Sequence, residues 1–443
     1  MSKTFRGGVH PLPGLHQGKP LTDNKPVKPY VSETVCIPLN MHIAAPPSTP
    51  VVKKGDRVLM GQVIAEGVGP RGVPVHASVS GTVKEVGAVQ QLGARTSPCI
   101  TIENDFQDEW VELKGLGNVE TCDPAAILPA IQAAGICGMG GAGFPTHFKL
   151  SVPPDKKVDT VILNGAECAT FLNADHRLML EYPGKVVDGL RAAMRAANVE
   201  TGYIAIEDNK RDAIAAISKA AAGRKGVHVV SLRAKYPQGA EKQIIKAITG
   251  REVPSGKLPA DAGCIVMNVG TAAAVADAVI DGRPLVERIT TVTGRVREPS
   301  NLLLRIGTIF LDAIGACGGY TVEEPGKIIS GGTMTGIAAP SETVSVTKTT
   351  GGIVVLSQKE ATSMEESPCI RCSRCVEVCP MHLNPFKLKN LCDMNDLKAA
   401  QANHIMDCIL CSSCSYICPS RRWIMSSIKN AREQIIAQQK KGV

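Results

Sequence analysis

Two cysteine runs near the carboxyl end restrict the fold of this chain more than any other feature. The first reads CIRCSRCVEVCP at residues 369–380, and the second reads CILCSSCSYICP at residues 408–419. Both have the spacing Cys-x2-Cys-x2-Cys-x3-Cys-Pro, which is typical of bacterial ferredoxins with two [4Fe–4S] clusters. We therefore expect residues 357–443 to form a ferredoxin-like helical module that holds two clusters.

In such ferredoxins each run gives three thiolates to one cluster and its last thiolate to the other. One cluster is therefore assigned to Cys369, Cys372, Cys375 and Cys418, and the other to Cys408, Cys411, Cys414 and Cys379. Zinc sites more often use two separated Cys-x2-Cys pairs. Disulfides need an oxidising compartment, and no signal peptide opens this chain. Iron–sulfur clusters are thus the favoured interpretation.

Length and charge limit the remaining possibilities. The chain has 443 residues, so we expect three or four domains. The net charge is +8, but the basic residues are spread out and aromatic residues make up only 3% of the chain, which argues against nucleic-acid binding. No apolar run approaches the ~18 residues needed to cross a bilayer. Any attachment to a membrane must therefore come from other subunits.

The amino-terminal third predicts an arm followed by a small β domain. Residues 1–30 are rich in Gly, Pro and His and indicate an extended arm. Within residues 31–115, VKKGDRVLMGQVIAE and VPVHASVSGTVKEV alternate around Gly-Asp and Ser-Gly turns, a pattern similar to the biotinyl/lipoyl (barrel-sandwich) fold. A carrier domain needs a lysine between these halves, and none occurs over residues 61–82. We expect the fold without the carrier function.

Residues 120–283 alternate between apolar strands and helices. VDTVILN, YIAIED, VHVVSL and CIVMNVG are each followed by a helical pattern, which predicts a parallel, doubly wound α/β sheet. Residues 284–356 are β-rich with Gly-Gly turns and indicate a small β-grasp-like domain. The fold class is therefore a multidomain α/β protein.

A second chemical signal is the glycine loop GICGMGGAGFPTHFK. Gly138, Gly140 and Gly143 match G-x-G-x-x-G, but the loop follows a helix and leads into Phe-Pro, so we reject the standard Rossmann fingerprint. Closely spaced glycines, Gly141 included, still let backbone N–H groups approach a phosphate. Lys149 could add positive charge.

Polar residues follow the predicted strands of the α/β domain, at residues 164–167, 207–209, 236–241 and 268–271. Ligands bind beyond the carboxyl ends of the strands in open α/β sheets. Helix capping explains any one of these residues, and for Asn209 or Thr271 capping is equally favoured. Together they favour a nucleotide-like ligand.

The motifs GGAGFPT, NGAEC, ADHRLM, EDNK, YPQGAEKQ and NVGTA, with GGVHP at the start, closely resemble the RnfC family, whose members belong to the Rnf electron-transport complex. The resemblance covers essentially the whole chain. A more distant similarity connects it with the flavin-binding, NADH-oxidising subunit of respiratory complex I. The resemblance implies FMN and NADH in the α/β domain, and SLBB (β-grasp-like) and ferredoxin domains around it.

Site residues carried over from the family fall into two groups. Those implied to contact FMN are Gly140, Gly141, Gly143, Lys149, Asn164, Glu167, Asn268 and Thr271, with Gly138 in the same loop. Those implied to contact NADH are Phe144, Tyr236 and Glu241. The family usually has Glu-Pro after NGAEC, whereas this chain has Ala169 and Thr170, which weakens the case for NADH.

The resemblance implies an NAD-dependent flavin and iron–sulfur oxidoreductase subunit without a covalent catalytic residue. It would pass electrons between NADH, FMN and two [4Fe–4S] clusters in an ion-translocating complex, at the cytoplasmic side of the membrane. Its implied partners are the A, B, D, E and G subunits and, indirectly, ferredoxin. Two alternatives stay open: an electron-relay subunit that does not use NADH, and a soluble flavin and iron–sulfur reductase that serves a partner enzyme.

Overall fold

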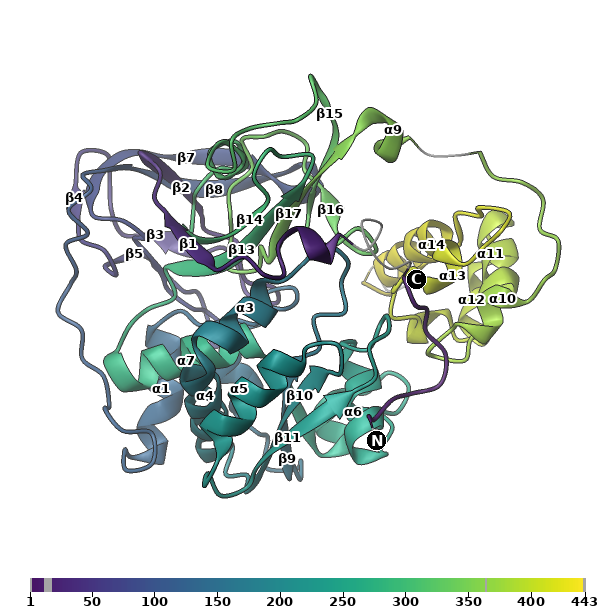
Figure 1. Ribbon diagram of the computed structural model, residues 1–443, viewed down its shortest axis with the longest axis horizontal. Coiled ribbons are helices and arrows are strands. Elements are labelled where there is room, and N and C mark those ends of the chain that lie inside the picture. The colour runs from purple at the N-terminus through teal and green to yellow at the C-terminus, as the bar shows by residue number, and fades with distance from the viewer. Residues whose placement is uncertain (1, 12–17, 363–364, 441–443) are drawn as a thin grey trace.

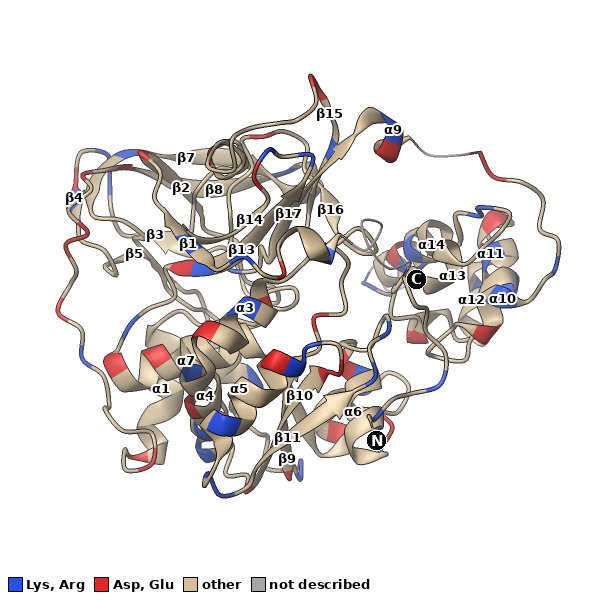
Figure 2. Ribbon diagram, viewed as in Figure 1, with Lys and Arg blue, Asp and Glu red and all other residues tan. Residues whose placement is uncertain are grey.

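The computed structural model describes residues 2–11, 18–362 and 365–440. In Figure 1 a helical carboxyl-terminal module, coloured yellow, stands beside the other domains. The amino-terminal segment, coloured purple, runs between this module and the central α/β domain. Lys and Arg are interspersed with Asp and Glu over all the domains (Figure 2), so no domain presents a basic stripe in this view.

Four parallel strands form the central sheet, in the order β11–β10–β9–β12. Their bounds are β9 (Thr160–Gly165), β10 (Thr201–Glu207), β11 (Val227–Leu232) and β12 (Cys264–Asn268). The winding direction reverses between β9 and β12, where an open sheet leaves a crevice for a ligand. Asn164 and Asn268 lie opposite each other at the carboxyl ends of these two strands.

Helices cover both faces of this sheet, as the nearly continuous apolar strands predict. On β9, Val161 and Leu163 belong to the core on one face, whereas Ile162 belongs to the core on the other. The first face carries α1 (Pro124–Ala133), α3 (Ala174–Glu181), α4 (Pro183–Ala196), α5 (Arg211–Ala221) and α7 (Val269–Asp281), and the second carries α6 (Glu241–Thr249). The short α2 (Thr146–Leu150) follows the glycine loop.

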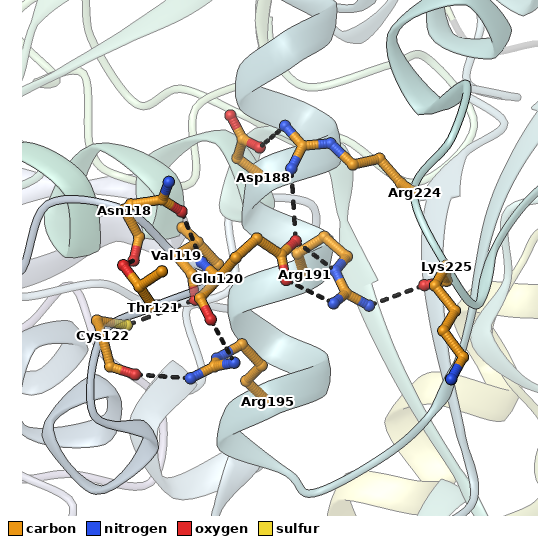
Figure 3. A network of polar contacts seen from close by, with 10 residues as sticks. All are labelled: Asn118, Val119, Glu120, Thr121, Cys122, Asp188, Arg191, Arg195, Arg224 and Lys225. Carbon is orange, nitrogen blue, oxygen red and sulfur yellow. Dashed lines mark hydrogen bonds and ion pairs between the residues drawn. The ribbon is translucent and has the colours of Figure 1, made fainter.

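A polar network holds the segment that leads into α1 (Figure 3). Glu120 accepts hydrogen bonds from Arg191 at 2.8 and 2.7 Å, and Arg224 lies 3.4 Å from the same carboxylate. Arg195, one turn along α4 from Arg191, donates to the Glu120 and Cys122 carbonyl oxygens at 2.9 and 2.6 Å. These contacts fix the start of α1 against α4, and with it the approach to the glycine loop.

The barrel-sandwich domain contains two small sheets, in the orders β2–β8–β7–β4 and β3–β5–β6. Its strands are β2 (Thr34–Pro38), β3 (Thr49–Pro50), β4 (Arg57–Val58), β5 (Val63–Glu66), β6 (Val75–His76), β7 (Gly81–Gln91) and β8 (Arg95–Asn104). Val35, Ile64 and Ile100 are fully buried in one core between the two sheets. This agrees with the expected fold.

The next domain is a mixed sheet in the order β1–β14–β13–β17–β15–β16. Its elements are β1 (Val27–Tyr30), β13 (Glu287–Gly294), β14 (Ser300–Arg305), α8 (Phe310–Gly315), β15 (Pro325–Ser330), β16 (Ile337–Ala338), β17 (Gly352–Ser357) and α9 (Gln358–Ala361). The strand β1 comes from the segment expected to be an extended arm and pairs in parallel with β14. The end of the arm thus joins a domain distant in sequence.

The carboxyl-terminal module repeats one small unit. Its helices are α10 (Arg374–Glu377), α11 (Pro385–Asp393), α12 (Leu397–Ala402), α13 (Ser413–Tyr416) and α14 (Ile424–Lys440). Ser373 and Ser412, at equivalent places in the two cysteine runs, both have left-handed backbone conformations. Ile428 and Ile435 of α14 are buried in the module core, so this amphipathic helix packs on the module. No helix among the described residues is long and apolar enough to cross a bilayer.

Candidate functional site

A pocket opens where the sheet changes its winding direction, at the carboxyl ends of β9 and β12. It collects residues from the glycine loop, from the β9–α3 loop, from β12 and from the mixed sheet. The lining residues are Met139, Gly140, Gly141, Asn164, Glu167, Cys168, Ala169, Leu172, Ala174, Asp175, Gly239, Asn268, Arg288, Gly331, Gly332, Thr335, Thr349 and Gly351. The structure thus brings together five residues singled out in the sequence: Gly140, Gly141, Asn164, Glu167 and Asn268.

The glycine loop is held at both ends and open in the middle. The Gly138 N–H donates to the Phe144 carbonyl oxygen at 2.9 Å, and the Met139 N–H donates to Thr271 Oγ1 at the same distance. A Cβ on Gly140 would meet Asn268 Cβ at 2.8 Å, so packing alone requires glycine there. A Cβ on Gly141 would meet no atom within 4 Å. Packing therefore does not explain Gly141, whereas an occupant of the pocket would.

The two asparagines use their side chains to shape the pocket walls. Asn164 Nδ2 donates to the Gly239 carbonyl oxygen at 2.7 Å. Asn268 Oδ1 accepts the Gly270 N–H at 2.8 Å and caps α7, while its Nδ2 donates to Asp175 Oδ2 at 2.6 Å. Capping was considered for Thr271, but Asn268 is the cap. The Thr271 hydroxyl supports the glycine loop from behind.

Two buried carboxyl groups lie in the pocket wall. Glu167 accepts from the Asp175 and His176 N–H groups at the start of α3, at 2.7 and 3.2 Å. Burial raises the pKa of Glu167 to about 7, against the opposing effect of the Lys19 ammonium. Burial also raises the pKa of Asp175. Both groups can therefore change protonation more easily than an exposed carboxylate when charge changes in the pocket.

Arg288 is a cationic group that the sequence did not single out, because it belongs to β13 in the neighbouring domain. Its side chain is buried, and its Nη1 donates to the Lys348 and Met139 carbonyl oxygens at 2.5 and 3.3 Å. It forms no ion pair within the described part of the chain. Burial lowers its pKa to about 10, and the nearby Asp175 partly opposes this. Arg288 therefore gives the pocket wall a positive charge, and within hydrogen-bond distance its only described partners are backbone carbonyl oxygens.

Several residues predicted for the site lie outside this lining. Lys149 forms a 2.7 Å ion pair with Glu241. Phe144 meets Phe148 edge to face, with ring centroids 6.0 Å apart. Tyr236 is only 4% exposed. Gly138, Gly143 and Thr271 shape the loop from behind rather than face the pocket.

Ala169, where the family usually has glutamate, is covered by a loop of the mixed-sheet domain. A Cβ on Gly332 would meet Ala169 Cβ at 2.9 Å. The adjacent Thr170 hydroxyl lies 2.7 Å from that of Thr333. This close approach links the β9–α3 loop to the loop between β15 and β16. No sequence signal predicted the contact, because it joins two domains.

Two further cavities lie in the carboxyl-terminal module, and each is lined by four cysteines. The first contains Cys369, Cys372, Cys375 and Cys418. The second contains Cys379, Cys408, Cys411 and Cys414. These are the two cross-paired sets that the spacing predicts. None of the sixteen cysteines forms a disulfide.

No set of three or more His, Cys, Asp or Glu side chains in the described ranges is placed to hold a single metal ion. A cubane does not need such a set, because its four thiolates bind four different irons. The linings of the two cavities fit such clusters. In each, three thiols come from one helical turn and its loop, and the fourth comes from the other run.

Family models match three parts of the chain. Residues 3–107 match the RnfC barrel sandwich hybrid domain, residues 131–277 the Nuo51 FMN-binding domain, and residues 289–338 the SLBB domain. The C-type subunit of the Na(+)-translocating ferredoxin:NAD(+) oxidoreductase complex of Acetobacterium woodii is 49% identical, over 99% of this chain and 98% of the relative. The chain belongs to the RnfC family.

Other RnfC proteins are similar over most of the chain. The C-type subunit of the proton-translocating ferredoxin:NAD(+) oxidoreductase complex of Clostridium ljungdahlii is 50% identical, over 88% of this chain and 85% of the relative. The C-type subunit of the ion-translocating oxidoreductase complex of Rhodobacter capsulatus is 39% identical, over 90% and 77%. These matches confirm the expected fold class and identify the chain as an oxidoreductase subunit with an FMN-binding domain.

The pocket residues fit an anionic flavin nucleotide. The backbone at Gly141 faces open space, and the switch-point position is where α/β sheets bind nucleotides. The buried guanidinium of Arg288 in the pocket lining supplies positive charge. The pocket therefore has room, donors and charge of the kind that FMN needs.

Proposed function

We propose that this chain is the electron-input subunit of an ion-translocating complex and exchanges electrons between NADH, FMN and two [4Fe–4S] clusters. The relatives in A. woodii and C. ljungdahlii are named as subunits of ferredoxin:NAD(+) oxidoreductases, which supports NAD and ferredoxin as the two ends of the reaction. The observation that carries the proposal is the grouping of eight cysteines into two sets of four, in the same chain as a glycine-loop pocket.

Bound FMN supplies the conversion between a hydride, which carries two electrons, and the single electrons that clusters accept. The protein has to hold the participants in place, and no side chain needs to act as a covalent catalyst. Gly140 and Gly141 let the backbone N–H groups approach the phosphate. Through their amide hydrogen bonds, Asn164 ties the end of β9 to the Gly239 carbonyl oxygen and Asn268 ties the end of β12 to Asp175.

Arg288 has a separate role in this proposal. Reduction adds negative charge to a flavin, and a buried cation nearby favours that charge more strongly than an exposed cation does. Arg288 also holds the Met139 carbonyl oxygen and so the base of the glycine loop. It therefore both shapes the loop and favours the reduced cofactor.

NADH is proposed as the donor through the residues that the family resemblance implies, Phe144, Tyr236 and Glu241. A second candidate function is an electron relay that exchanges electrons with the flavin without NADH. Two observations favour it. Ala169 replaces the usual glutamate and is covered by Gly332, and Tyr236 is buried.

We place the chain at the cytoplasmic side of the cell membrane, where NADH and ferredoxin are available, and bound there by other subunits of the complex. The described helices contain no spanning segment, and we propose that partner subunits provide the attachment. The proposed partners are subunits of the A, B, D, E and G type, with ferredoxin reached indirectly.

The test begins with the full-length chain purified without oxygen. We expect about eight irons and one FMN per chain, since two four-iron clusters are assigned. Titration with NADH should bleach the flavin absorbance. If the flavin resists NADH but dithionite reduces it, the relay function replaces the NADH function. A protein with zinc in place of iron, or with no flavin, overturns the proposal as a whole.

A further inference from the structure

Residues 3–9, here called the N-terminal strap, pair with the end of β11 and with the segment that follows it in the FMN-binding domain. The Lys3 N–H donates to the Ser231 carbonyl oxygen at 2.9 Å. Farther along, Val9 and Tyr236 exchange both backbone hydrogen bonds, at 2.7 and 2.8 Å. The strap thus follows one edge of the FMN-binding domain for its whole length.

The other side of the strap touches the cluster module. The Gly8 N–H donates to the Val378 carbonyl oxygen at 2.8 Å. A Cβ on Gly7 would lie 3.0 Å from the Cys379 carbonyl oxygen, and one on Gly8 would lie 2.7 Å from that of Tyr236. Both glycines have positive φ, +88° and +84°. Only glycine combines this backbone conformation with such close approach on both sides.

The Lys235 side chain binds the strap through hydrogen bonds and a cation–π contact. Its Nζ lies 3.8 Å from the centroid of the Phe5 ring and donates to the Phe5 carbonyl oxygen, and to that of Gly7 at 2.9 Å. Phe5 is buried although it lies near the start of the chain. These contacts hold the turn that presents Gly7 and Gly8 to the cysteine run.

The two cysteine cavities are therefore placed differently. Cys379 is buried, and next to it Gln243 Nε2 of α6 donates to the Pro380 carbonyl oxygen at 3.1 Å. The segment that pairs with the strap at Tyr236 continues to Gly239, which lines the pocket. In the other cavity, by contrast, Cys369 and Cys372 are exposed.

We propose that the strap positions the cluster of Cys379, Cys408, Cys411 and Cys414 as the first to exchange electrons with the flavin, and that the cluster of Cys369, Cys372, Cys375 and Cys418 is the exit to a partner. This inference rests on the proposed function. The first is called the inner cluster and the second the outer cluster. The two electrons of a reduced flavin leave one at a time: one passes through the inner cluster to the outer one, and the next reduces the inner cluster. The flavin protons go to solvent.

The strap is tested with Gly7→Ala and Gly8→Ala. Gly223→Ala is the matched control, because Gly223 also has positive φ, +78°, but its Cβ would meet nothing within 4 Å. Flavin is reduced by a light flash with a sacrificial donor, so NADH is not needed, and cluster absorbance is followed. We expect full iron and flavin in all three proteins, and cluster reduction slowed about tenfold or more in the two strap variants. Amide hydrogen exchange at Gly8 and Tyr236 should rise in the same variants only.

Lys235→Met and Lys235→Arg give a second, independent pair. Met removes the ammonium group and should slow cluster reduction, whereas Arg keeps the charge and should restore much of the rate. Normal rates in the two glycine variants and in Lys235→Met, at full cofactor content, would overturn the positioning role of the strap. Absence of iron or flavin in the unaltered chain would instead refute the proposed function.

The order of the clusters is tested separately. Cys372→Ala damages the outer cluster and should leave a fast transfer of one electron out of the flavin. Cys411→Ala damages the inner cluster and should remove that fast transfer, even though the outer cluster remains. The reverse pattern would refute the assignment of the inner cluster.

Discussion

Replacement of Gly141 by valine separates the requirement for a ligand from the requirement for a fold. Gly141 is exposed at the pocket, its φ is not positive, and an added Cβ would meet no protein atom within 4 Å. A substitution at such a position changes the free energy of unfolding by about 0.5 kcal/mol at most. The valine side chain would project into the space assigned to FMN.

The expected loss of affinity follows from overpacking. Extra methyl groups forced into a well-fitted contact cost about 1–3 kcal/mol, which is about a 5- to 140-fold weaker binding of FMN at 1.4 kcal/mol per tenfold change. Gly140→Ala should behave differently. Its Cβ would lie 2.8 Å from that of Asn268, so it should disturb the cap of α7 and lower the melting temperature of the protein.

The assay compares flavin released on denaturation, the Kd of added FMN and the melting temperature. Gly184→Val is the matched control, because Gly184 is also exposed, lacks positive φ and has no neighbour within 4 Å of an added Cβ. We expect weak FMN binding in Gly141→Val alone, with an unchanged melting temperature when the flavin-free proteins are compared, because bound FMN itself stabilises the fold. Wild-type affinity in that protein would show that the glycine loop does not contact the flavin.

Three further changes probe other parts of the molecule. Cys379→Ser should lower the iron content from about eight toward about four per chain, as measured by iron analysis, whereas Cys392→Ser, outside both cavities, should not. Ala169→Glu should tighten NADH binding about ten- to a hundredfold, since a hydrogen bond to a charged group contributes roughly 1.5–3 kcal/mol, as anaerobic titration of flavin absorbance would show; no change would mean that the covering loop excludes NADH from this side. Burial and, to a smaller extent, the Lys348 charge lower the pKa of His42 from 6.5 to about 2. Between these two pH values only the unfolded state binds this proton. The free energy of unfolding therefore decreases as the pH is lowered below ~6.5, by up to ~1.4 kcal/mol per pH unit. Denaturant titrations from pH 7 to pH 4 should show that the free energy of unfolding depends less steeply on pH in His42→Gln than in the unaltered protein. The surface control His404→Gln should keep the original dependence.

The sequence predicted the parts of the site that depend on local spacing. The two cysteine runs specify their cross-pairing because each has three closely spaced thiols and one distant thiol. The alternation of apolar strands and helices predicted a parallel sheet, and the strand ends at Asn164 and Asn268 then had to meet at one edge. The repeated cysteine spacing and the general rules for parallel sheets were sufficient for both predictions.

The remaining features depend on contacts between distant segments. Arg288 lies in β13 and has no motif around it in the sequence, yet the mixed sheet places it in the pocket wall. The family motif predicts that Tyr236 contacts NADH, but it does not predict that the Tyr236 backbone pairs with Val9 or that the residue is only 4% exposed. The motif GGVHP gave no chemical signal, because its glycines are needed only where Gly7 meets the Cys379 carbonyl oxygen and Gly8 meets that of Tyr236. Each case requires knowledge of what packs against the residue.

The barrel-sandwich domain lacks the lysine of a carrier domain but has a structural role next to the glycine loop. A Cβ on Gly143, at the end of the glycine loop, would lie 2.4 Å from the Met41 carbonyl oxygen of that domain. Lys348 lies behind the same loop and donates to the Gly135 carbonyl oxygen at 2.8 Å, and its Nζ is 3.2 Å from His42 Nε2. Burial lowers the pKa of Lys348 to about 8. Burying this ammonium group lowers the stability of the fold unless its hydrogen bonds compensate. The domain therefore supports the glycine loop from one side. This role requires the barrel-sandwich fold but does not require a lysine on its hairpin.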